Sequence, residues 1–178
     1  MPLITWRSPL RRLVLTSHVT FSVGWLGAVA AYLALAVTGL TTSDAEMMRA
    51  AYLSMATIAW TVIVPCSIAT LASGLVQSLT TEWGLFRHYW VLAKFLLTVA
   101  AVTVLLLHMP TVRRMAGIAA ASGGFGADVG ALQIQLVIHA GGGSVVLLTA
   151  TALSVYKPWG RIRRSPSAYQ GPSRDSGR

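Results

Sequence analysis

Four long apolar stretches, separated by short polar connections, make up most of this chain. Each is long enough for a helix to cross the hydrocarbon of a bilayer, which takes about 20 residues. Only 11% of the residues are charged, whereas an average soluble domain has about 25%. The composition therefore favours lipid as the solvent. The sequence predicts an all-α fold, a four-transmembrane-helix bundle that runs up-down-up-down.

The predicted domain organisation has three parts. Residues 1–12 form a basic lead, residues 13–158 form the transmembrane domain, and residues 159–178 form a basic disordered tail. Within the transmembrane domain, helices are expected over residues 13–40, 46–79, 86–109 and 131–156.

Local signals predict where these helices begin, bend and end. The segment Ser43-Asp44-Ala45-Glu46 supplies N-cap and first-turn chemistry for the second helix. Pro65 lies near the middle of that helix and is expected to kink it, with Thr61 and Ser67 able to bond the freed backbone groups. Pro110 is expected to end the third helix, before a connection that begins with a short helical segment.

The cations are distributed unevenly between the two ends of the predicted bundle. Ten lie on the side of the N-terminus, namely Arg7, Arg11, Arg12, Arg87, Lys157, Arg161, Arg163, Arg164, Arg174 and Arg178. Three lie on the other side, Arg49, Arg113 and Arg114, while Lys94 lies within a span. Because cytoplasmic flanks are enriched in Lys and Arg, both termini are predicted to be cytoplasmic. Topology and lipid-headgroup contact therefore explain the net charge of +9, and nucleic acid is not an expected partner.

All four histidines lie in the predicted spans or at their ends. An imidazole within a membrane pairs with a polar neighbour, relays a proton, or ligates a metal or haem. His18 and His88 lie toward the cytoplasmic side, and His108 and His139 toward the external side. The sequence thus predicts an inner pair and an outer pair.

The positions of His88 and His108 along the third helix predict the direction in which each faces. At about 100° per residue, His108 lies within roughly 40° of Lys94. Lys94, Thr98, Ala101, Leu105 and His108 therefore form one stripe, which is expected to face the bundle. His88 lies about 200° around the helix from His108 and is interpreted mainly as an interfacial residue.

The outer pair is the preferred candidate site. Side chains lean toward the N-terminus of their own helix, so His108 and His139 on antiparallel helices converge, with Gln135 as a hydrogen-bond partner of His139. Such a pair could ligate a b-type haem from both sides, bind a transition metal, or simply be hydrogen-bonded. Met109 and other methionines near His108 also suit copper(I).

Two further features remain open to more than one interpretation. Lys94 either snorkels to the surface or has a partner in the bundle, such as His18 with Ser22, or an anionic ligand such as a haem propionate or a quinone head. The glycines at 141–143, like the small residues of the first helix, are typical of helix-packing seams, although a flat cofactor could also use the space.

Three segments carry a family resemblance: residues 17–28 (SHVTFSVGWLGA), 73–94 (SGLVQSLTTEWGLFRHYWVLAK) and 139–158 (HAGGGSVVLLTATALSVYKP). In these the chain resembles a family of small four-helix bacterial membrane proteins, frequent in actinobacteria, that has no assigned activity. The resemblance covers roughly residues 13 to 158 and implies four spans in a bacterial inner membrane, but no catalytic residue. A looser similarity, in helix count and buried histidines, links it to membrane b-type cytochromes and copper-resistance membrane proteins.

Three functional hypotheses follow. The first is a haem-binding or redox membrane protein that uses His108 and His139, with His18, alone or together with His88, as a second and weaker site. The second is a cofactor-free accessory or scaffold subunit of a larger membrane complex, or a homo-oligomer. The third is a small metal or solute transporter that uses His18, Lys94 and the external Met and His residues. The lack of carboxylates in the apolar stretches, residues 13–40, 50–79, 91–109 and 131–156, disfavours it. The same lack argues against hydrolytic and nucleophilic enzymes.

Overall fold

The computed structural model describes residues 8–80, 89–121, 125–126 and 129–156. Within them the chain forms α1 (Ser8–Thr41), α2 (Ala45–Ile58), the π-helical segment η1 (Ala59–Ile63), α3 (Val64–Thr80), α4 (Tyr89–Ala120) and α5 (Val129–Tyr156). Because α2, η1 and α3 follow one another without a break, they form one long helix.

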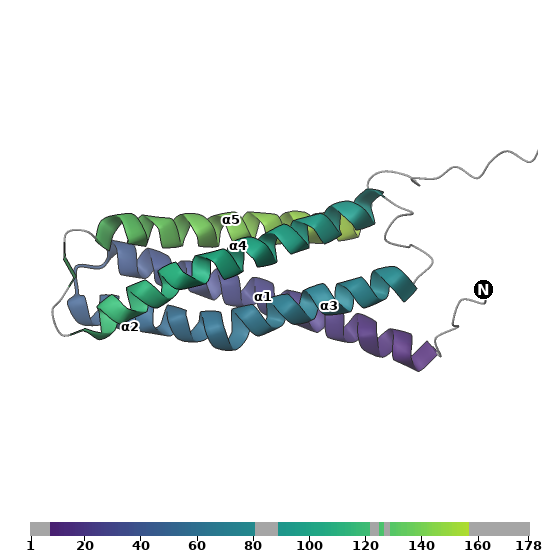
Figure 1. Cartoon of the computed structure of the whole chain (residues 1–178), viewed down its shortest axis with the longest axis horizontal. Helices are drawn as coiled ribbons and strands as arrows, with labels where there is room; N and C mark the ends of the chain where they lie inside the picture. The colour runs from purple at the N-terminus through teal and green to yellow at the C-terminus, as the bar shows by residue number, and fades with distance from the viewer. Residues whose placement is uncertain (1–7, 81–88, 122–124, 127–128, 157–178) are drawn as a thin grey trace, which may run out of the picture.

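The fold is an all-α four-helix bundle, as the sequence predicts. Each of the four helices is long and apolar enough to cross a membrane, and successive helices run in opposite directions (Figure 1). α1 begins and α5 ends at the same end of the bundle (Figure 1). We call this the first end, and the end that holds the connection between α1 and α2 the second end.

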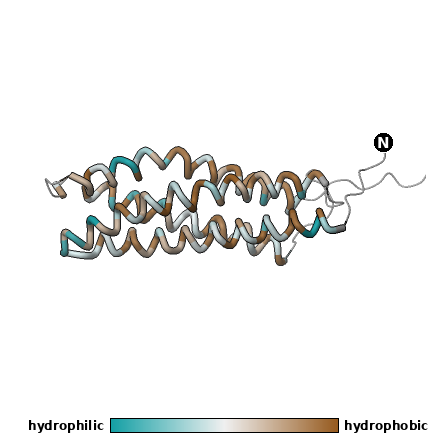
Figure 2. Tube along the Cα trace, turned by 90° about the horizontal axis from the view of Figure 1, so that it is seen from below, coloured by the Kyte–Doolittle hydropathy of each residue, from teal (hydrophilic) through white to brown (hydrophobic). Residues whose placement is uncertain are grey.

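The surface of the bundle is largely apolar. Figure 2 shows apolar residues along its whole length and the most hydrophilic stretches toward its two ends. Large side chains such as Leu107 and Val155 are 75% and 70% exposed. A water-soluble domain rarely leaves such a continuous apolar surface uncovered, whereas hydrocarbon solvates it.

The start of α2 confirms the predicted N-cap. The backbone of Asp44 is extended, and its carboxylate accepts a hydrogen bond of 2.9 Å from the amide of Glu46. This bond satisfies one of the amides that a helix leaves unpaired at its N-terminus.

Pro65 changes the backbone hydrogen-bond pattern of the second long helix. The five residues of η1 end directly before Val64 and Pro65. A proline has no amide hydrogen and its ring crowds the carbonyl four residues earlier, and a π-helical turn is a common way to absorb such a defect. The hydroxyls of Thr61 and Ser67 each donate to a carbonyl one turn earlier, of Thr57 and Val64.

The prediction that Pro110 ends the third helix is wrong. α4 continues through Pro110 to Ala120. The part of α4 that follows Pro110 contributes to the core of the bundle, where its residues Val112, Met115 and Ala119 are buried. Their packing stabilises the helix beyond the point where local propensity alone would stop it.

Candidate functional site

Two of the cavities formed by the described residues lie between the helices of the bundle. The first, of about 590 Å³, lies toward the first end and is lined by polar residues that include Arg11, His18, Thr70, Gln77, Lys94 and Ser154. The second, of about 310 Å³, is lined by Tyr32, His108, Met109, His139, Gly142 and Gly143 among mostly apolar residues. We call them the basic cavity and the histidine cavity. Trp25 and Leu147 line both.

The predicted stripe on the third helix faces these cavities. Lys94 and Thr98 line the basic cavity, and Ala101, Leu105 and His108 line the histidine cavity. The prediction that these five residues share one face of the helix, turned toward the bundle, is therefore confirmed. His88 lies outside the described residues.

His108 of α4 and His139 of α5 meet inside the bundle. Their imidazole rings stack with centroids 4.1 Å apart and an angle of 11° between the ring planes. The predicted convergence of these side chains is therefore confirmed. It follows from the antiparallel course of α4 and α5, since each side chain leans toward the N-terminus of its own helix.

His139 has a hydrogen bond that fixes its tautomer. Its Nδ1 lies 2.8 Å from the backbone carbonyl oxygen of Gln135. A carbonyl can only accept, so Nδ1 carries the proton and Nε2 keeps its lone pair in the neutral ring. Gln135 is thus the partner expected from the sequence, through its backbone rather than its amide side chain.

His108 is the more unusual member of the pair. Its side chain is only 6% exposed, and neither ring nitrogen has a hydrogen-bond partner. An unsatisfied buried polar group costs about 1–3 kcal/mol. A native protein that keeps such a group usually has a functional reason, such as a redox role or an ion.

The histidine cavity has the donor chemistry of a metal or haem site. Imidazole nitrogen and the thioether of the adjacent Met109 are ligands for haem iron or copper(I). Beside His139, a Cβ placed on Gly142 would meet nothing within 4 Å, and one on Gly143 would meet only Val29 Cγ1 at 3.9 Å. The glycines therefore leave space along this face of α5.

One geometric condition applies to shared ligation. The nitrogen lone pairs of an imidazole lie in the plane of its ring, so two stacked rings do not direct them at a common point. Ligation of one centre by both residues requires at least one ring to turn about its side-chain torsions. Among the residues that the structure describes, no group of three or more His, Cys, Asp or Glu could hold a metal ion.

His18 lines the basic cavity and is fixed by α3. Its Nδ1 lies 3.0 Å from Ser73 Oγ, and this hydroxyl donates in turn to the carbonyl of Ala69 at 2.6 Å. Nδ1 of His18 is therefore the donor in the first bond. Gly74 makes room for the ring, because a Cβ at that position would lie 3.1 Å from His18 Cε1.

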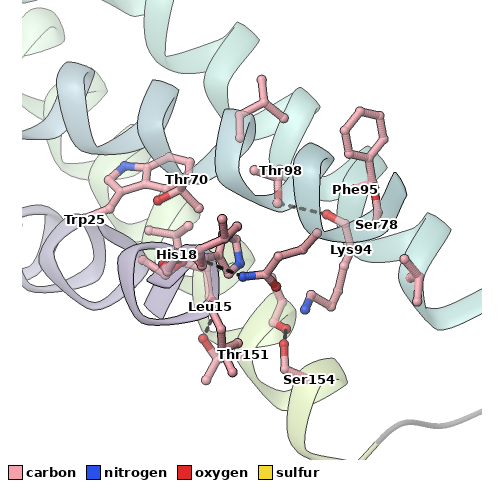
Figure 3. A pocket seen from close by; sticks show the side chains of 18 of the residues that line it. Leu15, His18, Trp25, Thr70, Ser78, Lys94, Phe95, Thr98, Thr151 and Ser154 are labelled. Atoms are coloured by element: carbon pink, nitrogen blue, oxygen red, sulfur yellow. Dashed lines mark hydrogen bonds between the residues drawn. The ribbon is translucent and has the colours of Figure 1, made fainter. Parts of the chain in front are cut away.

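Lys94 reaches the same cavity from α4. Figure 3 shows its side chain among the lining residues, on the same side of the cavity as Phe95 and Ser78. Its Nζ lies 5.7 Å from the centroid of the Trp90 ring, within the range of a cation–π interaction. The predicted neighbours His18 and Ser22 line the cavity as well. Lys94 and the outer histidines, however, lie in different cavities.

Several residues of the basic cavity were not singled out from the sequence. Gln77 donates to the carbonyl of Val14 at 3.2 Å and so links α3 to α1; an amide within an apolar span was a signal that could have found it. Arg11 was assigned only a topological role. Nothing local marks Thr70, because its place in the cavity depends on how α3 packs.

Comparisons of the chain with protein-family profiles, curated proteins and solved structures found no match. No family is therefore identified for it. The structure itself defines the class, a polytopic membrane protein built from four long apolar helices.

Proposed function

We propose that this is a redox protein of the bacterial inner membrane that binds haem b through His108 and His139, with both termini in the cytoplasm. The observation that carries the proposal is His108, buried against a second imidazole with neither of its nitrogens hydrogen-bonded. In an apolar interior such an imidazole is a strong ligand, because ligation satisfies a nitrogen that is otherwise unpaired.

The surroundings of the pair support this proposal. The bond from His139 Nδ1 to the Gln135 carbonyl is the arrangement that orients metal-ligating histidines and raises their basicity. Gly142 and Gly143 give close access to the face of α5. A bound haem would supply one-electron chemistry, and the apolar walls of the cavity would exclude water from it.

The size of the cavity sets a further requirement. At about 310 Å³, it lies near the lower limit of small-molecule pockets, about 300–1,000 Å³. A macrocycle at this site must separate the stacked rings and widen the gap between α4 and α5. A single metal ion needs much less space.

The test is a visible spectrum of protein purified in detergent from haem-replete cells. We expect a Soret band that sharpens on reduction and that His108→Ala and His139→Ala each abolish. His18→Ala is the matched control, because His18 lies in the basic cavity, and should keep the band. A colourless wild-type protein, or a band that survives both outer substitutions, would refute the proposal.

A metal determination on the same samples separates haem from copper. If the protein is colourless but carries stoichiometric copper that His108→Ala and Met109→Leu remove, the site is a copper(I) site. His108, Met109 and His139 all line the histidine cavity, so this outcome would retain the residues and replace the cofactor.

A second candidate function is that of an accessory subunit in a larger membrane complex or homo-oligomer. Its support is a row of exposed small residues on α1: Gly27, Ala30, Ala31 and Ala34. A Cβ on Gly27 would meet nothing within 4 Å, whereas one on Gly24 would contact Cys66. Small residues allow close helix approach in lipid. Gly27→Leu should then release a co-purifying partner or copy, and Val23→Ala on the same exposed side should not.

A further inference from the structure

Two cationic side chains line the basic cavity, and no acidic side chain does so among the residues that the structure describes. The cations are Arg11 and Lys94. Asp44 and Glu46 lie at the second end of the bundle, at the start of α2. The other acidic residues of the chain, Glu82, Asp128 and Asp175, lie outside the described residues. Positive charge that is partly removed from water is stabilised by an anion.

The two cations lie close to the first end of the bundle. Arg11 is three residues from the start of α1, and Lys94 is five residues from the start of α4. At 1.5 Å per residue they lie only about 5 and 8 Å from the first end of the bundle. Lys94 is also held over the Trp90 ring, which limits the positions that its ammonium group can reach.

Farther into the bundle, the same cavity contains a hydroxyl that has no partner. Thr70 is 6% exposed and its Oγ1 makes no hydrogen bond. It lies ten residues before the end of α3, about 15 Å from the first end. Figure 3 places its side chain near His18. A ligand that pairs with the two cations and with the Thr70 hydroxyl must carry an anionic group near the first end of the bundle and a hydrogen-bond acceptor farther into the cavity.

The cavity also reaches the surface that faces lipid. Leu15 of α1 is 53% exposed, and Thr151 of α5 is exposed as well, yet both line the cavity. The cavity is therefore accessible from the side of the bundle at these two residues. Apolar residues such as Leu26 and Leu147 also line it. A molecule can enter by this route from within the bilayer.

We propose that the basic cavity binds an anionic glycerophospholipid. Its phosphate lies between Arg11 and Lys94, its ester carbonyls point toward Thr70, and its acyl chains leave between α1 and α5. A phospholipid carries phosphate, ester and acyl chain in the order in which the cavity offers cations, hydroxyl and an apolar opening. A free phosphate shares only the first of these features.

The test is a lipid titration of the delipidated full-length protein in a neutral detergent, followed by native mass spectrometry. Phosphatidylglycerol and phosphatidylcholine with identical acyl chains are the probes. We expect the anionic lipid to bind at least about tenfold more tightly. Each of Arg11→Gln and Lys94→Gln should weaken it by about fivefold, and the double variant by about thirtyfold. The effect on phosphatidylcholine should be smaller, because its choline offsets the charge of its phosphate.

Matched control variants separate loss of the specific site from general effects of substitution. Arg114→Gln removes an exposed cation near the second end and should leave binding unchanged. Lys94→Arg should retain binding and shows that charge is the property required. Thr70→Val should weaken both lipids and Thr70→Ser neither, which provides an independent reading if the double variant does not fold.

Three outcomes would overturn the proposal. The first is equal affinity of the wild-type protein for the two lipids. The second is an unchanged preference for phosphatidylglycerol over phosphatidylcholine in a folded protein that carries both Arg11→Gln and Lys94→Gln. The third is displacement of phosphatidylglycerol by an excess of inorganic phosphate or glycerol phosphate. The last outcome would identify a site for a soluble anion.

Discussion

Gly39 of α1 lies directly against the ring of Tyr52 in α2: a Cβ on Gly39 would be 2.6 Å from Tyr52 Cζ and 2.7 Å from its hydroxyl oxygen. Tyr52 is 1% exposed and stacks at an angle on Phe125, with ring centroids 6.1 Å apart. The ring has little room to move. The close approach of α1 and α2 at the second end thus depends on the absence of a side chain at Gly39.

Gly39→Ala is therefore expected to destabilise the bundle. Overpacking of this kind costs about 1–3 kcal/mol, against a gain of at most about 1 kcal/mol in helix propensity. Thermal unfolding in detergent measures the balance. Gly117→Ala is the control, because a Cβ there meets nothing within 4 Å, and it should be neutral or stabilising. Equal melting temperatures for the two variants would show that the ring of Tyr52 yields freely.

His108→Leu should stabilise the protein when it is purified from cells depleted of haem and copper. The substitution removes two buried nitrogens that have no hydrogen bond, and the gain is about 1–2 kcal/mol. His139→Leu should not stabilise it, because it removes the bond to the Gln135 carbonyl. Denaturant unfolding of the three proteins gives the comparison. A destabilised His108→Leu protein would mean that the imidazole serves packing rather than ligation.

Pro110→Ala should raise the melting temperature. Pro110 is exposed within α4, and alanine restores an amide hydrogen that can bond the carbonyl of Leu106. Proline costs about 3 kcal/mol more than alanine in a helix interior, and part of this should be recovered. Leu107→Ala, on the same exposed surface, controls for lost lipid contact. A lower melting temperature would show that the local geometry at Pro110 is needed for packing.

Arg49 is expected to stabilise the end of α4. Its Nη2 donates to the carbonyl of Ala121 at 2.9 Å, where the last carbonyls of a helix lack intrahelical partners. Arg49→Gln should lower the free energy of unfolding by about 0.5–1 kcal/mol, and hydrogen exchange at the end of α4 should increase. Arg114→Gln should change neither measurement. An unchanged exchange rate in Arg49→Gln would contradict a capping role.

The helices and the orientation of α4 could be predicted because both depend on local periodicity. Rotation of 100° per residue is enough to put Lys94 and His108 on one face, and helix direction is enough to bring His108 toward His139. The continuation of α4 past Pro110 could not be predicted this way. It depends on contacts of Val112 and Met115 with other helices, which outweigh the local effect of proline.

The basic cavity could not be predicted from the sequence, because it too depends on contacts between helices. Arg11 and Lys94 lie far apart in the chain, and only the packing of both α1 and α4 against α3 and α5 brings them to one space. His18 and Lys94 were suggested as neighbours, but Thr70 has no distinguishing pattern around it. Gln135 could be predicted as the partner of His139 from helix periodicity, but its backbone carbonyl could not be predicted as the bonding atom because that depends on side-chain torsions.

Trp25, which lines both cavities, lies near the midpoint of α1. Its side chain therefore borders both the more polar space around His18 and Lys94 and the mainly apolar space around His108 and His139. Any change in the size or position of this one indole alters the shape of both spaces at once.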